Sequence, residues 1–267
     1  MLLREVEYAK PASVADALSL LAGNDGARAL AGGQTLINVM KARAASPDVL
    51  VDLNGLDDLK GIELAGDGTL TIGAMTTYTE VMESAEAKAR PILAEVVGTI
   101  ADVQVRNRGT VGGNVCANDP TNHLPPLMTA IGARFHIVGA GGDREVSAEE
   151  FFLGVYMTAV GPGELLAKIT IPAGKGDGFA AITLGADGTC IANAAASLNG
   201  SLRVALGCVD AVPIVLEPAS TEEAAVREAV RAAGLAPPSD VHASSEYRAH
   251  LAEVLAVRAA RQAQERT

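Results

Sequence analysis

Apolar and polar positions along the first fifty residues follow two periods in turn, which predicts alternating strands and helices. Short apolar or alternating runs predict strands over residues 4–10, 27–30 and 48–53. Apolar side chains at helical spacing predict helices over residues 11–23 and 37–45. Ser13 and Asp16 have the spacing of a capping box. The pattern therefore predicts a β-α-β-α-β unit, with the glycine segment 31–36 directly after its second strand.

The remaining pattern predicts an α+β chain. Strands are expected in residues 66–76 after a Gly-Asp-Gly turn, in 165–172, and in two hairpins over 135–146 and 191–209. Asn199-Gly200 between apolar runs predicts a type I′ turn in the second hairpin. Helices are expected over 89–101, 123–133, 221–234 and 244–263, and Ser147 with Glu150 has the spacing of a capping box. Residues 174–178, GKGDG, look like a boundary between two regions.

Composition narrows the class of protein. Of 267 residues, 49% are hydrophobic and 20% charged, which is typical of a globular protein. No apolar run reaches the roughly 18–20 residues of a membrane span. Arg4, Glu5 and Glu7 stand where a signal peptide needs apolar residues, so a cytoplasmic location is expected. The net charge is −11 and no Lys/Arg run occurs, which disfavours nucleic acid as a partner.

The cysteines and histidines form no recognisable metal motif. The three cysteines, Cys116, Cys190 and Cys208, contain no CxxC pair, so neither a disulfide framework nor a zinc or iron–sulfur site is indicated. The four histidines form no HExxH. No acid/base dyad or nucleophile arrangement stands out either. The sequence therefore predicts no catalytic side chains and no metal ligands.

Two short glycine motifs stand out, AGGQTL at 31–36 and GTVGGN at 109–114. Neither is a P-loop or the GxGxxG of a dinucleotide fold. Paired glycines let a backbone approach a ligand, and successive N–H groups can converge on an anion. Side-chain donors for phosphate or ribityl oxygens would come from Gln34, Thr35, Thr110 and Asn114. The alternative, that each Gly-Gly pair is only a tight turn, stays open at this point.

Several segments, in order, resemble the FAD-binding medium subunits of molybdenum hydroxylases, the family of carbon monoxide, xanthine and aldehyde dehydrogenases. They are AGGQTLINVMKAR, TIGAMTTYTEV, VQVRNRGTVGGNVCANDPTNHLPPLMTAIGA, FFLGVYMTAVGPGELLAKITIP and ALGCVDAVPIVL. The resemblance extends to about Leu216. It implies a two-subdomain FAD-binding fold of the vanillyl-alcohol-oxidase/PCMH type over residues 1–172, divided into about 1–53 and 54–172. A C-terminal sheet-and-helix domain would follow over 177–267.

The resemblance also implies a set of FAD-binding residues. The pyrophosphate would lie against both glycine motifs, Ile100 would pack on the cofactor, Leu166 would lie near the flavin ring, and Asp119 would lie close by. The full set is Ala31, Gly32, Gly33, Gln34, Thr35, Leu36, Ile100, Thr110, Gly112, Gly113, Asn114, Asp119, His123 and Leu166. Among their neighbours, Arg106 and Arg108 would face phosphates, a partner or solvent. Cys116 is expected to pack as a small hydrophobe, Tyr156 in a core or interface, and Asp119-Pro120 in a turn.

This chain departs from the family pattern in two places. His123-Leu124 stands where many members have an acidic residue, which puts a ribose or ribityl contact there in doubt. In FAAITLGADGTCIANAA, Ala181 stands near a family lysine and Gly188-Thr189 near an Asp-aromatic pair. Less charge and no aromatic ring would then face the flavin. A changed flavin potential, oxygen access or choice of acceptor is the expected consequence.

The resemblance implies that this chain is an electron-transfer subunit. A large partner would carry the molybdopterin cofactor and a small partner the [2Fe–2S] clusters, in a heterohexamer with two copies of each chain. FAD on this chain would pass electrons to an external acceptor. A flavin-binding scaffold or sensor without redox turnover is the alternative. A self-contained flavin oxidase is disfavoured, because no further substrate domain remains after Leu216.

Overall fold

The N-terminal sheet is parallel, with the strand order β1-β3-β2. The computed structural model describes residues 2–185 and 188–267. The strands are β1 (Glu7–Ala9), β2 (Ala27–Leu30) and β3 (Val49–Asp52), and they are connected by α1 (Val14–Ala22) and α2 (Leu36–Lys41). The Ser13 hydroxyl accepts a hydrogen bond from the Asp16 N–H at 3.1 Å and begins α1. The predicted β-α-β-α-β unit is confirmed.

An antiparallel five-stranded sheet follows, with the order β4-β5-β10-β6-β7. Its strands are β4 (Ile62–Leu64), β5 (Leu70–Gly73), β6 (Arg134–Gly139), β7 (Arg144–Ser147) and β10 (Glu164–Ile171). The hairpin β8 (Phe152–Gly154) and β9 (Met157–Thr158) lies outside this sheet. The helices of this region are η1 (Asp57–Leu59), α3 (Tyr78–Glu83), η2 (Glu86–Ala89), α4 (Ile92–Gly98), α5 (Val103–Arg106), α6 (Val111–Ala117), α7 (Leu124–Ala130) and α8 (Ala148–Phe151). They bury a core in which the Phe135 and Phe151 rings stack with centroids 4.0 Å apart.

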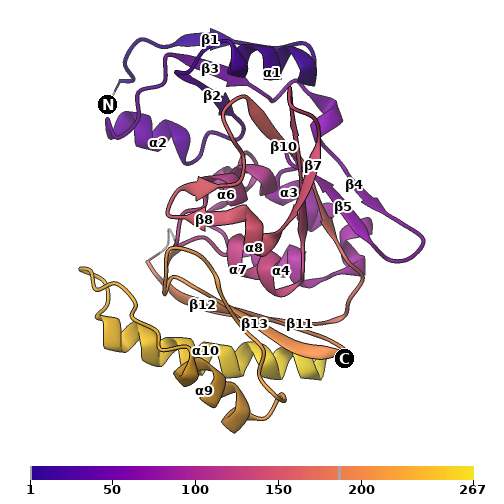
Figure 1. Ribbon diagram of the computed structural model, residues 1–267, viewed down its shortest axis with the longest axis vertical. Coiled ribbons are helices and arrows are strands. Elements are labelled where there is room, and N and C mark those ends of the chain that lie inside the picture. Colours follow the sequence, from indigo (N-terminus) through magenta and orange to yellow (C-terminus); the bar gives the residue numbers. More distant parts are fainter. Residues whose placement is uncertain (1, 186–187) are drawn as a thin grey trace.

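The C-terminal sheet has the order β11-β12-β13-β14 and lies between two helical layers. Its strands are β11 (Gly176–Leu184), β12 (Thr189–Asn199), β13 (Ser201–Gly207) and β14 (Ile214–Leu216). One face contacts α7, and α9 (Glu223–Ala232) with α10 (Ser245–Glu265) covers the other (Figure 1). Alanines on β12 and α10 keep this layer thin, and a Cβ at Gly178 would overlap the Ala259 carbonyl oxygen. Small side chains therefore let the long helix approach the sheet closely.

A buried ion pair joins the C-terminal sheet to the rest of the chain. Arg90 Nε donates to Asp177 at 2.7 Å and Arg90 Nη2 to the same carboxylate at 2.9 Å, with both side chains 2% exposed. The guanidinium also donates to the Pro172 carbonyl and to Ser197 Oγ. Removal of one partner from such a pair costs about 3–5 kcal/mol, because the other charge stays buried without compensation. The pair therefore fixes where β11 begins relative to η2.

Two expectations from the sequence need correction. The second glycine motif was expected to be a loop, but its TVGGN portion begins α6, because Thr110 caps that helix. The type I′ turn is wrong, since of Asn199 and Gly200 only Gly200 has a positive φ, of 87°. Within the predicted boundary at residues 174–178, β11 begins at Gly176, and the boundary itself stays a prediction. Within the described residues, none of the helices combines the length and apolar character that crossing a bilayer requires.

Candidate functional site

The first glycine motif leaves the end of β2 and enters α2 as a half-exposed loop. Asn54 Nδ2 donates to the Ala31 carbonyl at 3.1 Å and anchors the start of this loop to the residues after β3. Gln34 Nε2 donates to the Gly32 carbonyl at 3.2 Å. Gly33 has a φ of 73°, a left-handed conformation that glycine adopts without steric cost. The motif is therefore held in one conformation by its own polar side chains.

A row of backbone donors in this loop has no acceptor within the protein. In residues 2–185 and 188–267, the N–H groups of Gly32 to Leu36 donate no hydrogen bond. The first intrahelical bond of α2 begins one residue later, from the Ile37 N–H to the Gly33 carbonyl at 3.1 Å. The Thr35 hydroxyl caps none of these groups. Consecutive free N–H groups of this kind form a binding surface for phosphate oxygens.

The second glycine motif is built differently. Thr110 Oγ1 accepts a hydrogen bond from the Gly113 N–H at 3.0 Å, and the Asn114 N–H donates to the Thr110 carbonyl at 3.0 Å. The Gly112 N–H donates to the Ala74 carbonyl at 2.9 Å. A Cβ on Gly112 would lie 2.5 Å from Ala74 Cβ. These glycines therefore serve close packing, and their N–H groups are already used by the protein.

The two motifs touch each other. A Cβ on Gly32 would overlap the Arg108 carbonyl oxygen and come within 2.9 Å of Gly109 Cα. A Cβ on Gly113 would lie 3.6 Å from Ala31 Cβ, in ordinary van der Waals contact. Residues separated by some seventy-odd positions thus form one continuous surface. The sequence-based expectation that both motifs contribute to one site is compatible with this contact.

Asn114 adds a buried acceptor beside this surface. Its Nδ2 donates to the Tyr78 hydroxyl at 2.9 Å, and its Oδ1 is buried with no hydrogen-bond partner in the described residues. Burial raises the pKa of Tyr78 to about 12, so this tyrosine stays neutral at physiological pH. A buried unpaired amide oxygen is costly unless a ligand donor satisfies it. Sequence reasoning found Asn114 but missed Tyr78 and Asn54, which no spacing signal marks.

The other sequence-predicted positions lie around this surface at varying depth. Leu166 is buried in β10, and the next residue, Ala167, accepts the Ala74 N–H at 2.9 Å. Ile100 packs against the central core after α4. The Ala74 carbonyl also accepts the Gly112 N–H. Ala74 is therefore hydrogen-bonded both to β10 and to the second motif. These contacts place the Leu166 strand beside α6.

Asp119 and His123 are engaged elsewhere. Asp119 Oδ1 accepts the Thr121 N–H at 2.9 Å, which confirms the predicted turn. His123 is 5% exposed, with its Nδ1 3.3 Å from Asn193 Nδ2 and its ring centroid 5.2 Å from that of Phe179. In the described residues, none of their side-chain hydrogen bonds joins either residue to a glycine motif. Their proposed contacts with a cofactor stay predictions.

The flanking residues also have definite places. Arg106 Nη1 donates to the Ile100 carbonyl at 3.0 Å and the Ala101 carbonyl at 2.7 Å, so it holds the turn after α4. Cys116 packs against the central core, as expected of a small hydrophobe. Tyr156 is not in a core, because it is 62% exposed and has a φ of 55°. Its hydroxyl donates to Asp119 at 3.0 Å.

Part of the second departure from the family pattern is described. Ala181 lies on β11 and pairs with Asn193, and Thr189 begins β12. Gly188 has a φ of 72°, and a Cβ there would come within 3.8 Å of the Ala101 N. Ala186 and Asp187, in the same GADGT stretch, lie outside the described residues. Gly188 thus lies near the turn that follows α4.

Comparison with known proteins decides the family. Residues 4–174 match the family model described as the FAD binding domain in molybdopterin dehydrogenase. The chain belongs to this family. It is 37% identical to the carbon monoxide dehydrogenase medium chain of Afipia carboxidovorans, over 97% of each chain. This FAD-binding chain is thus an oxidoreductase flavoprotein subunit of the molybdenum hydroxylase class.

Solved structures agree with the sequence comparison. A chain of the reconstituted carbon monoxide dehydrogenase from Oligotropha carboxidovorans superposes with a TM-score of 0.93, at 36% identity and 100% coverage of both chains. A chain of quinoline 2-oxidoreductase from Pseudomonas putida 86 gives 0.90, at 31% identity and 99% coverage of both. The whole of this FAD-binding chain, including α9 and α10, therefore has the architecture of these flavoprotein chains.

The residues present fit a dinucleotide. The free N–H row from Gly32 to Leu36 provides donors for a diphosphate, which is the anionic part of FAD. The unpaired Asn114 Oδ1 provides a buried acceptor for a hydroxyl donor, of which the ribityl chain has several. The absence of side chains at Gly32 and Gly113 brings both groups to one surface. Donor, acceptor and close approach thus match the chemistry of the cofactor that the family binds.

Proposed function

We propose that this chain is the FAD-binding electron-transfer subunit of a multi-subunit molybdenum hydroxylase. It accepts electrons from [2Fe–2S] clusters on a small partner and passes them to an external acceptor, while a large partner holds the molybdopterin cofactor. The observation that carries this proposal is the contact between the two glycine motifs, with free donors on one side and an unpaired buried acceptor on the other. FAD, when bound, supplies both one-electron and two-electron transfer.

The chain's residues bind and orient the cofactor in this proposal. The N–H groups of Gly32 to Leu36 hold the pyrophosphate, and Ala31 and Gly33 set the path of the backbone. Thr110, Gly112 and Gly113 place the second motif against the first, and Asn114 Oδ1 accepts from the cofactor. Ile100 and Leu166 exclude water from the apolar part of the cofactor. Asp119 and His123 lie farther from the cofactor. The proposal needs no catalytic side chain, because the cofactor carries the redox chemistry.

The domain boundaries and assembly follow the same proposal. The PCMH-type FAD-binding domain covers 1–172, with subdomains of about 1–53 and 54–172, and 177–267 forms the C-terminal domain. The assembly is a heterohexamer with two copies of each of three chains. The cytoplasmic location expected from the sequence stays a prediction. The relatives named as medium chains support a multi-subunit assembly, and family membership favours electron transfer over the scaffold or sensor alternative.

The test begins with the purified full chain. Its near-ultraviolet and visible absorption spectrum is recorded, and the flavin released by denaturation is identified by chromatography. Stoichiometric FAD, together with anaerobic reduction of that FAD in the purified three-subunit complex by the complex's organic donor, supports electron transfer. A complex whose bound FAD stays oxidised under those conditions supports the scaffold or sensor alternative. A chain that stays colourless with added FAD contradicts both.

A further inference from the structure

Two cysteines that the FAD site does not use lie side by side at one end of the C-terminal sheet. Cys190 is the second residue of β12, and Cys208 directly follows β13. Asn193 Nδ2 is 3.4 Å from Cys190 Sγ and 3.6 Å from Cys208 Sγ. Both are free thiols, and neither belongs to a disulfide. The two sulfur atoms therefore share one amide donor at the same end of the sheet.

The backbone is irregular at both cysteines. The register of β11 against β12 shifts so that Ile182 pairs with Ala192 and Thr183 with Cys190, which leaves Ile191 as the extra residue of a β-bulge. Cys208 has a φ of 65°, a left-handed conformation that is unfavourable for a residue with a side chain. A bulge re-aims the side chain beside it. Two separate irregularities thus bring both sulfur atoms to Asn193.

The surroundings of the pair are polar although buried. Asn193 is fully buried, and its Oδ1 has no hydrogen-bond partner in the described part of the chain. A Cβ at Gly207 would overlap this oxygen and come within 2.8 Å of Pro126 Cγ, so a glycine is needed beside the amide. His123 Nδ1 lies 3.3 Å from Asn193 Nδ2. The Cys208 thiol and the His123 ring lower the pKa of Cys190, which favours a thiolate there.

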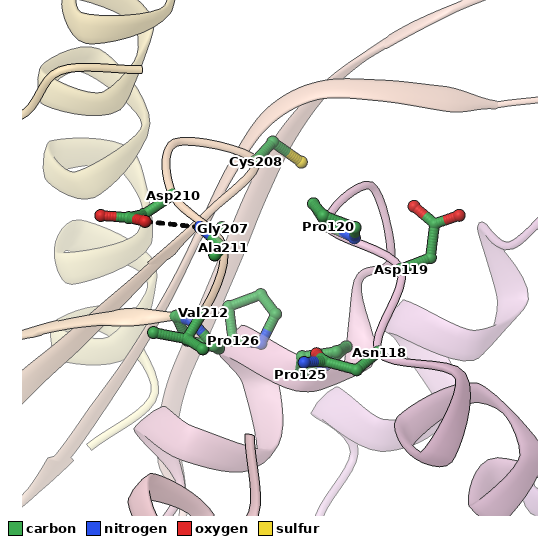
Figure 2. A pocket seen from close by; sticks show the side chains of 11 residues that line it. Asn118, Asp119, Pro120, Pro125, Pro126, Gly207, Cys208, Asp210, Ala211 and Val212 are labelled. Atoms are coloured by element: carbon green, nitrogen blue, oxygen red, sulfur yellow. Dashed lines mark hydrogen bonds between the residues drawn. The ribbon is translucent and has the colours of Figure 1, made fainter. Parts of the chain in front are cut away.

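A narrow opening leads to Cys208. Cys208 lines a cavity of about 10 Å³, whose other lining residues are Asn118, Asp119, Pro120, Pro125, Pro126, Gly207, Asp210, Ala211, Val212 and Pro213. Figure 2 shows the Cys208 sulfur on the side of the Asp119-Pro120 turn. A space of this size admits a molecule about as large as water. Hydrogen peroxide, with two oxygen atoms, is the oxidant nearest to this limit, whereas disulfide oxidants are far larger.

We propose that Cys190 and Cys208 are a redox-active dithiol that hydrogen peroxide oxidises to a disulfide. The Cys190 thiolate attacks one peroxide oxygen, the O–O bond breaks, and the leaving hydroxide takes up a proton as water. Cys208 Sγ then attacks the resulting sulfenic sulfur, the S–O bond breaks, and a second water leaves with the Cys208 proton. Two thiols lose two electrons and two protons, and one peroxide becomes two waters. An external dithiol reverses the step by exchange.

The test counts thiols in the full chain after peroxide treatment. The folded protein is exposed to a small excess of hydrogen peroxide, denatured in N-ethylmaleimide, and analysed by intact mass and non-reduced peptide mapping. We expect a product lighter by two hydrogens, in which two of the three thiols are lost and a Cys190–Cys208 link is found. Dithiothreitol restores all three. Oxidation to sulfinic acid, a link that includes Cys116, or three unchanged thiols would overturn the proposal.

Cys116 is a control within the same chain. Burial raises its pKa to about 12, and it lies in α6 rather than at the end of the C-terminal sheet, so it should stay reduced. Cys116→Ser should therefore still form the link, whereas Cys190→Ser and Cys208→Ser should each abolish it. Circular dichroism checks that the three variants fold alike. A link that forms no faster in the folded chain than in the chain unfolded in urea would also contradict a built site, and this comparison needs no variant.

Discussion

The two glycine motifs share a Gly-Gly pair, a Thr and a side-chain amide, but they have different physical roles. In AGGQTL the backbone is half-exposed, Gly33 is left-handed, and the N–H groups of Gly32 to Leu36 have no acceptor in the described residues. In GTVGGN the glycines lie in the first turn of α6, and the N–H groups of Gly112 and Gly113 are bonded to Ala74 and Thr110. The first motif presents donors to a ligand. The second lets α6 approach its neighbours closely.

This difference shows why a shared motif does not imply a shared mechanism. Sequence reasoning assigned both motifs the same role, an anion-binding nest. A Thr at the N-cap position changes the outcome, because its hydroxyl competes for the N–H groups that a nest would offer. The second motif contributes through side chains and through contact with the first. Substitutions that affect affinity in one motif should therefore affect stability in the other.

Gly32→Ala should have the largest effect. The added Cβ overlaps the Arg108 carbonyl oxygen, a backbone atom that cannot move aside cheaply, so the two motifs must separate. We expect FAD affinity to fall about 100-fold, equal to about 2.7 kcal/mol, as measured by fluorescence titration of the apo chain. Gly66→Ala is the matched control, because a Cβ there meets nothing within 4 Å. Equal affinity of the Gly32 variant and wild type would contradict the contact.

Gly112→Ala should lower the stability of the chain and leave its FAD affinity nearly unchanged, in contrast to Gly32→Ala. Its Cβ would come 2.5 Å from Ala74 Cβ and from the Ala74 carbonyl oxygen, which is overpacking. We expect the free energy of unfolding in urea to drop by about 1–3 kcal/mol, while the folded fraction keeps its affinity for FAD within about twofold. A large loss of affinity without loss of stability would show that Gly112 faces the ligand instead.

Alkaline pH should lower the free energy of unfolding, because the buried Tyr78 hydroxyl beside the second motif then ionises. The pKa of this phenol is raised from 10.0 to about 12, so its contribution to stability is complete below pH 10 and is lost as pH rises toward 12. The sign follows because the unfolded chain releases the proton first. At pH 11 the expected loss is about 1.4 kcal/mol relative to Tyr78→Phe, which lacks the proton. If the free energies of unfolding of the two proteins changed equally with pH, the raised pKa of Tyr78 would be refuted.

Thr110 and Thr35 provide the comparison with the smallest expected effects. Thr110→Val removes the acceptor of the Gly113 N–H and should cost about 1 kcal/mol of stability. Thr35→Val removes a hydroxyl that caps nothing in α2, so stability should change by less than about 0.5 kcal/mol. Its FAD affinity should instead fall about fivefold, as expected for one lost hydrogen bond. Equal stability losses in urea unfolding for both variants would remove the distinction between the motifs.

The sequence predicted most elements because local signals agreed with the fold. Ser147 and Glu150 form both halves of their capping box, and the hairpin around Asn199-Gly200 is confirmed apart from its turn type. The structure could not be predicted where distant residues decide it. Arg90 and Asp177 are 87 positions apart and carry no shared signal. Whether the N–H groups of Gly32 to Leu36 stay free depends on which acceptors the folded chain brings near them. The amino-acid composition does not reveal this.

Amide hydrogen exchange of the full chain, with and without FAD, tests the central claim most directly. Peptides covering 31–36 should exchange rapidly in the apo chain, because their N–H groups are free, and should become protected when FAD binds. Peptides covering 111–115 should be protected in both states, because their N–H groups are bonded within the protein. Protection gained only in 111–115, with 31–36 unchanged, would contradict the assignment of the pyrophosphate to the first motif.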